Sequence, residues 1–186
     1  RVQYGHDQSQ QVVFLSLPHS AAVEALLHSS LTRLAPGSIV IDTSTTTPAT
    51  AALCASVLSP LRVHFLDSPV TGEEKRAEEG TLTFITSGNK EVYDSVTPLL
   101  RHMGTQLVHV SEENGKAQLT KALNNALYNI SVVAMAEVLT VARESGLDPE
   151  AFVEVVRTGS GSSFGFNKFA PLCLLGHLQA PEHGYA

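Results

Sequence analysis

The chain has 186 residues, enough for one domain with a sizeable core or for two small domains. Hydrophobic residues make up 43% of the sequence and charged residues 16%, which is typical of a globular protein and not of a disordered one. The 12 Lys and Arg are outnumbered by 18 Asp and Glu, so a nucleic-acid-binding protein is disfavoured. Only two cysteines are present, Cys54 and Cys173, which excludes a disulfide scaffold and favours an intracellular compartment.

We expect no membrane-spanning segment. The longest apolar stretch without a charged residue, residues 122–136, contains three asparagines, whereas a transmembrane helix needs about 20 mostly apolar residues. This stretch therefore predicts a helix that is buried among other helices. The polar residues 1–10 have no apolar core, so neither a signal peptide nor a transit peptide is expected.

The first half of the chain alternates short apolar runs with helical stretches. The runs that predict strands are residues 12–17, 39–41, 63–66, 81–85 and 106–110. Between them, residues 20–28, a segment ending near residue 57 and residues 90–103 predict helices. Continuously apolar strands separated by helices are typical of βαβ units and of a mostly parallel sheet covered on both faces. The predicted fold class is α/β.

The second half is predicted to be helical. From Lys116 to about Ser145 we expect one long helix, because between residues 117 and 142 only Lys121 and Glu137 are charged and Gly and Pro are absent. Gly146 ends this helix. Asp148 and Pro149 begin the next, as an acidic N-cap followed by proline in the first turn.

Two polar clusters directly follow predicted strands. Residues 42–48, Asp-Thr-Ser-Thr-Thr-Thr-Pro, follow one strand, and residues 67–72, Asp-Ser-Pro-Val-Thr-Gly, follow the next. Ligands of open parallel sheets bind outside the carboxyl ends of the strands, and backbone N–H groups beside a glycine can hold an anion. Ordinary structure explains both clusters too: the first can be a helix start capped by Thr46 or Thr47, and the second can be a turn.

A third cluster lies on the long predicted helix. Lys121, Asn124 and Asn125 are spaced i, i+3 and i+4, so they share one face of an otherwise apolar helix. Burial would lower the pKa of the lysine and make it a usable proton carrier near neutral pH. A structural polar network between the two halves is the alternative. We expect no metal site, because the eight histidines form no i, i+4 pair on a predicted helix and the two cysteines are far apart.

In this order the clusters resemble the motifs of the β-hydroxyacid dehydrogenase family, which contains 3-hydroxyisobutyrate dehydrogenase and 6-phosphogluconate dehydrogenase. The matching motifs are Leu17-Pro18, Asp42-x-Ser44-Thr45-x-x-Pro48, Asp67-Ser68-Pro69-Val70-Thr71-Gly72 with Ala77-x-x-Gly80-Thr81-Leu82, and Gly115 followed by Lys121, Asn124 and Asn125. Together they span about residues 12–165, and the agreement of four motifs in order and spacing makes a chance match improbable.

The resemblance implies a fold and an activity. The fold is a Rossmann-type parallel sheet in residues 1–112 that lacks its first βαβ unit, followed by an incomplete all-α domain in residues 113–186. The activity is hydride transfer between a nicotinamide cofactor, NAD or NADP, and a small 3-hydroxy acid, as in 3-hydroxyisobutyrate dehydrogenase. Asn124 stands where the sugar-phosphate branch of the family has histidine, which favours the small hydroxy acids.

The resemblance also implies site residues. Lys121 would be the general base that takes the hydroxyl proton during oxidation and the acid in reverse. The residues implied at the substrate are Thr71, Gly72, Asn124 and Asn125, and those implied at the nicotinamide are Leu17, Pro18 and Thr45.

Departures from the family pattern keep a second function open. No G-x-G-x-x-G precedes the first strand, and Thr71, Glu73 and Ala117 replace a serine and two glycines of the pattern. A non-catalytic fragment or oligomerisation module with the dehydrogenase fold would tolerate these changes, although it would not need a buried lysine. In either case the apolar helix predicts a homo-oligomer, and the family implies the mitochondrial matrix or the cytoplasm.

Overall fold

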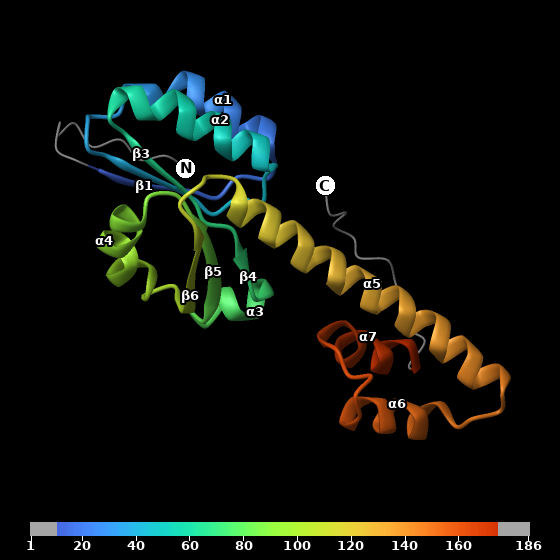
Figure 1. Ribbon diagram of the computed structural model, residues 1–186. Helices are drawn as coiled ribbons and strands as arrows, with labels where there is room; N and C mark the ends of the chain where they lie inside the picture. Colours follow the sequence, from blue (N-terminus) through green and yellow to red (C-terminus); the bar gives the residue numbers. More distant parts are fainter. Residues whose placement is uncertain (1–10, 175–186) are drawn as a thin grey trace. The chain divides into compact units, whose positions relative to one another are not determined.

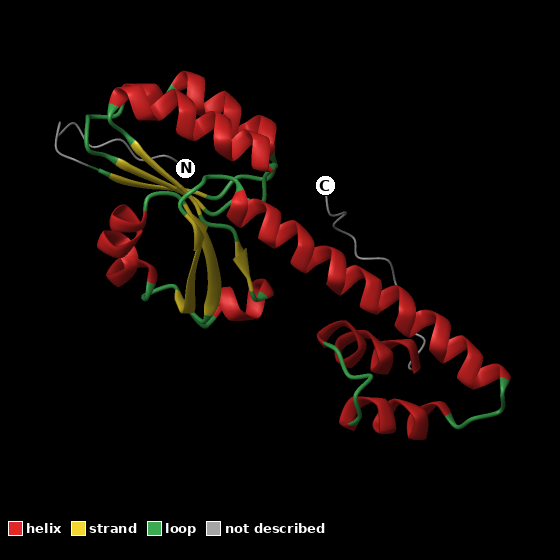
Figure 2. Cartoon of the chain, in the orientation of Figure 1, coloured by secondary structure: helices red, strands yellow, loops and turns green. Residues whose placement is uncertain are grey.

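The computed structural model describes residues 11–174 (Figure 1). The chain divides into two compact units, the first ending at Ala122 and the second beginning at Leu123. The first unit combines strands and helices, whereas the described part of the second contains only helices (Figure 2). This division falls inside the long helix, and the domain boundary at residue 112 stays a prediction.

The elements agree closely with the expected strands and helices. The strands are β1 (Val12–Leu15), β2 (Ile39–Asp42), β3 (His64–Asp67), β4 (Val70–Thr71), β5 (Leu82–Ser87) and β6 (Gly104–Ser111). The helices are α1 (Ser20–Ser29), α2 (Pro48–Leu58), α3 (Glu73–Glu78), α4 (Lys90–Leu100), α5 (Lys116–Glu144), α6 (Pro149–Thr158) and α7 (Phe164–Leu174), with 3-10 turns η1 (Leu31–Arg33) and η2 (Ser59–Leu61).

The six strands form one mixed sheet. Its order is β1-β2-β3-β5-β4, and β6 pairs with β5. β1, β2 and β3 are parallel, and β5 and β6 are parallel, which confirms the predicted α/β fold with a largely parallel sheet. The sequence did not reveal that β5 runs antiparallel to β3 and meets it only at the pair Asp67 and Ser87. It also did not reveal β4 or α3, which are only two and six residues long.

Hydrophobic residues on alternating positions of the strands face two separate cores. Val40 and Phe65 pack with α1 and α2 on one face, whereas Ile41 and Leu66 pack with α4 on the other. Figure 1 shows α1 and α2 together over one face of the sheet and α4 below the other. Because both faces are covered, β2 and β3 are apolar at successive positions, as buried parallel strands require.

The long helix α5 has the predicted bounds but not the predicted burial. Its large apolar side chains are exposed, including Leu123 at 62%, Leu127 at 70% and Ile130 at 64%. The expectation of a helix wrapped by other helices is therefore wrong for the described residues.

α5 is also long and apolar enough to cross a membrane, by length and composition alone, and the absence of a membrane-spanning segment stays a prediction. Its first turn nevertheless belongs to the sheet unit. Two buried side chains, Asp67 and Ser87, accept hydrogen bonds from backbone N–H groups of Gly115, Ala117 and Gln118.

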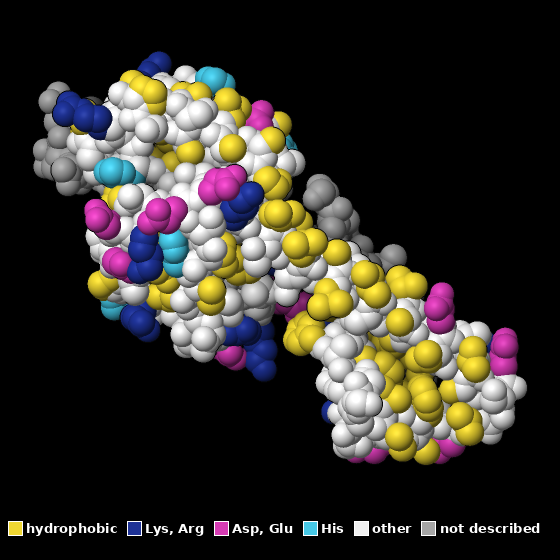
Figure 3. Space-filling view, in the orientation of Figure 1, with side chains coloured by type: hydrophobic (Ala, Val, Ile, Leu, Met, Phe, Trp, Pro, Cys, Tyr) yellow, Lys and Arg dark blue, Asp and Glu magenta, His cyan; other side chains and the backbone are white. Residues whose placement is uncertain are grey.

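The second unit has a small core of its own. Met135 of α5 packs with Val153 of α6 and with Phe166 and Ala170 of α7. Asp148 caps α6 by accepting a hydrogen bond from the backbone N–H of Glu150, with Pro149 in the first turn as predicted. Hydrophobic side chains remain visible over the surface of these helices (Figure 3).

Candidate active site

The carboxyl ends of the strands converge where α5 begins. Leu15, Asp42 and Asp67 end β1, β2 and β3 and lie in register with one another. Asp67 also pairs with Ser87, the last residue of β5. Because β3 and β5 are antiparallel there, their carboxyl ends meet. This is the part of an open sheet where ligands bind, and the predicted clusters that begin at Asp42 and Asp67 are both located there.

A buried carboxylate fixes the start of α5. Asp67 is fully buried and accepts hydrogen bonds from the backbone N–H of Gly115 at 3.1 Å and of Gln118 at 3.4 Å. The Ser87 hydroxyl donates to the same carboxylate at 2.7 Å, and the Asn114 side-chain amide donates at 3.0 Å. A negative charge at a helix N-terminus is stabilised by the orphan N–H groups and by the helix dipole. Asp67 therefore sets the position of the helix that carries Lys121.

Gly115 is required for this close approach. Its φ is +95°, which favours glycine, and a Cβ at this position would lie 2.7 Å from the carbonyl oxygen of Pro48. The start of α5 thus packs directly on the start of α2, next to the loop that carries Thr45.

Asp42 has a different environment from Asp67, although the two are adjacent in register. Its Oδ1 accepts a hydrogen bond from the Ser44 backbone N–H at 3.0 Å, while its Oδ2 has no hydrogen-bond partner among residues 11–174. Burial raises the pKa of Asp42 above its usual 3.8, and the nearby charge of Asp67 raises it further. The strand ends therefore hold one well-bonded carboxylate, Asp67, and one carboxyl group that burial pushes toward its neutral form.

The loop between β2 and α2, residues 43–47, contains Thr45 and is called the nicotinamide loop below; it is hydrogen-bonded both to the segment that follows β1 and to α5. Ser44 Oγ accepts a hydrogen bond from the Leu17 backbone N–H at 2.8 Å. The side-chain amide of Gln118 donates to the Ser44 carbonyl at 2.9 Å and accepts from the Thr46 N–H at 3.0 Å. The structure thus brings Leu17 and the residues on either side of Thr45 together with the first turn of α5. Sequence reasoning missed Gln118, whose position three residues before Lys121 was the available signal.

The residues predicted at the nicotinamide are accessible. Pro18 and Thr45 are exposed and Leu17 is half-buried, at the carboxyl ends of β1 and β2. Thr46 Oγ1 is buried and has no hydrogen-bond partner in the described part of the chain. This hydroxyl could therefore form a hydrogen bond with a bound ligand. These features fit the nicotinamide end of a dinucleotide. The loop also forms the capped helix start that was the alternative prediction, because Thr47 caps α2 by accepting a hydrogen bond from the Thr50 N–H.

Lys121 is half-buried on α5, and burial lowers its pKa below the usual 10.5. Its ammonium forms no hydrogen bond or ion pair with the other described residues. A lysine in this state gives up its proton more readily than one on the surface. The predicted burial of the neighbouring amides is wrong, because Asn124 is exposed and Asn125 only half-buried. Both belong to the second unit, beyond Ala122.

Thr71 and Gly72 join β4 to α3. Thr71 ends β4, and Gly72 has a φ of +138°, where a Cβ would lie 2.9 Å from Cβ of Arg76. Glu73, which replaces a glycine of the family pattern, has a φ of +60°. A non-glycine residue in this left-handed region is strained, which explains the glycine of the pattern in physical terms. No hydrogen bond joins Thr71 or Gly72 to Lys121 within residues 11–174.

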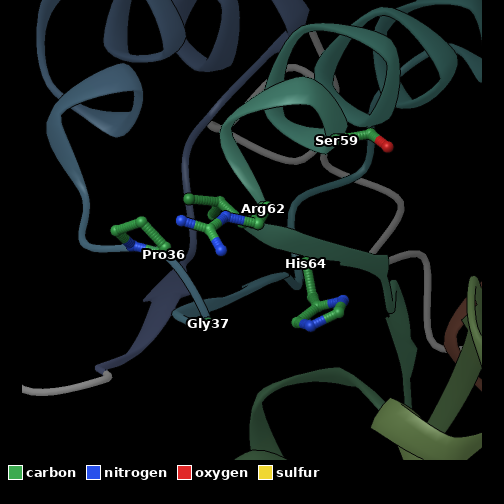
Figure 4. Close-up of a pocket in the computed structure, with 6 residues that line it drawn as sticks. Pro36, Gly37, Ser59, Arg62 and His64 are labelled. Atoms are coloured by element: carbon green, nitrogen blue, oxygen red, sulfur yellow. The ribbon is translucent and has the colours of Figure 1, made fainter.

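A pocket elsewhere in the first unit is not this site. It is lined by Pro36, Gly37, Ser59, Arg62, Val63 and His64 (Figure 4). These residues precede β2 or β3, except His64, which begins β3, so the pocket lies at the amino ends of the strands whose carboxyl ends carry Asp42 and Asp67. Among the described residues, no group of three or more His, Cys, Asp or Glu is placed to hold a metal ion.

Family models match almost the whole chain. Residues 6–111 match the NAD binding domain of 6-phosphogluconate dehydrogenase. Residues 115–180 match the NAD-binding domain of NADP-dependent 3-hydroxyisobutyrate dehydrogenase. The chain belongs to the β-hydroxyacid dehydrogenase family. The predicted family and the predicted cofactor, NAD or NADP, are thereby confirmed.

Individual relatives agree with this family. A 3-hydroxyisobutyrate dehydrogenase of Pseudomonas aeruginosa is 34% identical over 96% of this chain and 61% of its own length. A 2-(hydroxymethyl)glutarate dehydrogenase of Eubacterium barkeri is 29% identical over 84% of this chain and 52% of its own length. The chain thus spans about half to three-fifths of the length of these relatives.

Solved structures share the fold. A 3-hydroxyisobutyrate dehydrogenase of Mycobacterium tuberculosis, solved with L-serine, has a TM-score of 0.81 at 26% identity and covers 86% of this chain and 55% of its own. A protein named Psf3, solved with NADP+ and 2-OPP, has a TM-score of 0.78 at 31% identity and covers 89% of this chain and 59% of its own.

Proposed function

We propose that the protein containing this chain is an NAD(P)-dependent dehydrogenase of small 3-hydroxy acids, most like 3-hydroxyisobutyrate dehydrogenase. The observation that carries the proposal is a half-buried lysine of lowered pKa on the helix that is hydrogen-bonded to the nicotinamide loop. Relatives named as dehydrogenases of 3-hydroxyisobutyrate, 2-(hydroxymethyl)glutarate and L-serine support this substrate class, since all three are small hydroxy acids.

Lys121 supplies the proton transfer. In the oxidation direction its neutral amine accepts the proton of the substrate hydroxyl, and in the reduction direction its ammonium returns that proton. Desolvation makes both states accessible, because it stabilises the neutral amine relative to the ammonium. A lysine is suited to this role, whereas an arginine would keep its proton.

The other site residues bind and orient. Leu17, Pro18 and Thr45 would hold the nicotinamide end of the cofactor, which when bound accepts a hydride from the carbinol carbon. Backbone N–H groups at Thr71 and Gly72 would bind the substrate carboxylate. Asn125 would orient the substrate and Asn124 would contribute to its selection.

The test is a steady-state assay of the full-length protein with NAD and with NADP. 3-Hydroxyisobutyrate and L-serine are offered as substrates, with isobutanol, which lacks the carboxylate, as the matched control. Reduction of the nicotinamide with a hydroxy acid and not with isobutanol is expected. No reduction with either acid and either cofactor would contradict the proposal. The matches to dehydrogenases give no support to the alternative of a non-catalytic module.

The protein is also expected to assemble into a homo-oligomer. Leu123, Leu127 and Ile130 are spaced i, i+4 and i+7, so they form one exposed apolar stripe on α5. Light scattering should therefore give a mass at least twice that of one chain, and Leu127→Glu should reduce it to that of one chain by placing a charge in the interface. A single-chain mass for the unaltered protein would contradict this expectation.

We infer an intracellular location. Several relatives carry the word mitochondrial in their names, among them 3-hydroxyisobutyrate dehydrogenases of Drosophila melanogaster and Mus musculus, while others are bacterial. The mitochondrial matrix and the cytoplasm both remain compatible with this inference.

A further inference from the structure

We propose that Gln118 is a positioning residue that sets the nicotinamide loop at a fixed distance from Lys121. This inference rests on the proposed dehydrogenase function. It starts from a polar side chain that is almost fully buried, with only 1% of its surface exposed. Burial of an amide is costly unless its donor and acceptor are both satisfied.

Both ends of the Gln118 amide bind the same loop. Nε2 donates to the Ser44 carbonyl at 2.9 Å, and Oε1 accepts from the Thr46 N–H at 3.0 Å. The two partners are backbone atoms on either side of Thr45, so the amide holds the backbone of the loop and leaves the Thr45 side chain exposed. The loop cannot slide or rotate on α5 without breaking one of these bonds.

The other end of the connection is the helix itself. Gln118 and Lys121 are spaced i and i+3, so they lie on neighbouring positions of one helical face. This turn of α5 is held by Asp67, which accepts from the Gln118 backbone N–H at 3.4 Å. Gln118 therefore links the loop to the turn that carries Lys121, and the sheet fixes that turn.

Ser44 extends the connection to the segment that follows β1. Its hydroxyl accepts from the Leu17 N–H and its carbonyl accepts from Gln118, so a single residue joins both segments predicted at the nicotinamide. The resulting path from Leu17 through Ser44 and Gln118 to the α5 turn consists entirely of hydrogen bonds between buried or half-buried groups. A displacement of about 1 Å between reacting groups can cost about 10²-fold in rate, so such a link has a function beyond stability.

The experiment compares Gln118→Met, which keeps the side-chain length but neither hydrogen bond, with Gln118→Glu, which keeps the acceptor for Thr46. Gln106→Met, at an exposed position of β6, is the matched control. Titrations measure the affinity of each protein for NAD or NADP, whichever the unaltered protein uses, and for ADP-ribose or its 2′-phosphate, which lack the nicotinamide. Amide hydrogen exchange without cofactor reports on the Thr46 N–H.

For Gln118→Met we expect kcat to fall about tenfold or more, with dinucleotide affinity weakened about threefold to tenfold and affinity for the nicotinamide-free analogue unchanged. Exchange of the Thr46 amide should accelerate in Gln118→Met and much less in Gln118→Glu, and Gln106→Met should resemble the unaltered protein. Equal losses of affinity for both ligands would assign Gln118 a purely structural role and overturn the inference. Unchanged kcat and affinity in Gln118→Met would also overturn it.

If Gln118→Met does not fold, Gln118→Glu carries the test, because it should show the same pattern to a smaller extent. An inactive unaltered protein would refute the proposed function, whereas the Thr46 exchange still reports on the Gln118 link. The two failures are therefore distinguishable.

Discussion

Replacing Lys121 by Met is expected to lower kcat of the full-length protein by about 10²-fold or more, the usual effect of losing a general acid or base. Lys121→Arg should not restore the rate, because a guanidinium keeps its proton at all accessible pH values. Lys116→Met is the matched control: this lysine lies five residues earlier on α5 and pairs with Glu113 at the surface. Steady-state kinetics of the three variants test the assignment, and near-normal turnover of Lys121→Met would refute it.

The same substitution should not destabilise the protein. The pKa of Lys121 in the folded state lies below the usual 10.5, so between these two values the unfolded chain binds more protons than the folded one. Stability should therefore rise with pH through this interval, and at neutral pH the desolvated ammonium is unfavourable for folding. Urea unfolding of Lys121→Met should give a free energy of unfolding equal to or higher than that of the unaltered protein, with a weaker pH dependence. A clear loss of stability would indicate a structural role for the lysine.

Replacing Asp67 by Asn is expected to have the largest effect on stability. One carboxylate oxygen becomes an NH2 group, so a hydrogen-bond acceptor of the side chain is lost. The new NH2 group also faces the donors of Ser87, Asn114 and α5, and two donors cannot bond to each other. Hydrogen bonds to a buried charged group contribute about 1.5 to 3 kcal/mol each, so a loss of roughly 3 kcal/mol or more is expected. Urea unfolding measures it directly.

Asp42→Asn is the matched control for this prediction, because Asp42 is buried at the same register position of the neighbouring strand. Its folded-state pKa is raised above 3.8, so the folded state binds more protons than the unfolded chain between these two values. Stability should therefore fall as the pH rises through that interval, and Asp42→Asn should remove this dependence at little cost. Equal losses for the two variants would contradict the assignment of distinct roles.

Most of the fold could be predicted from local sequence patterns. Continuous apolar runs predicted β2 and β3, and the acid–proline pair at Asp148 predicted the start of α6. The meeting of β3 and β5 at Asp67 and Ser87 could not be predicted, because strand direction depends on long-range packing that no single run encodes. The exposure of α5 was missed for a related reason. An apolar composition indicates that a surface tends to be covered but not which molecule covers it.

The candidate site was predictable where a residue carries chemistry of its own. Lys121 stands out because an ionisable group interrupts an apolar helix, and the family motif added Thr45, Thr71 and Gly72. Gln118 and Ser87 did not stand out, because an amide or a hydroxyl is unremarkable in a sequence. Their importance depends on burial and on partners up to 74 residues away, as in the bond from Gln118 to Ser44.

The proposed hydride transfer can be followed with an isotope in the full-length protein. 3-Hydroxyisobutyrate with deuterium in both positions of its carbinol carbon is incubated with the cofactor, and the reduced nicotinamide is analysed by mass spectrometry. Each reduced nicotinamide should carry one deuterium, and deuterium transfer in Lys121→Met should be slower by about 10²-fold or more. Reduced nicotinamide without deuterium, or no reduced nicotinamide from the unaltered protein, would contradict the proposed transfer.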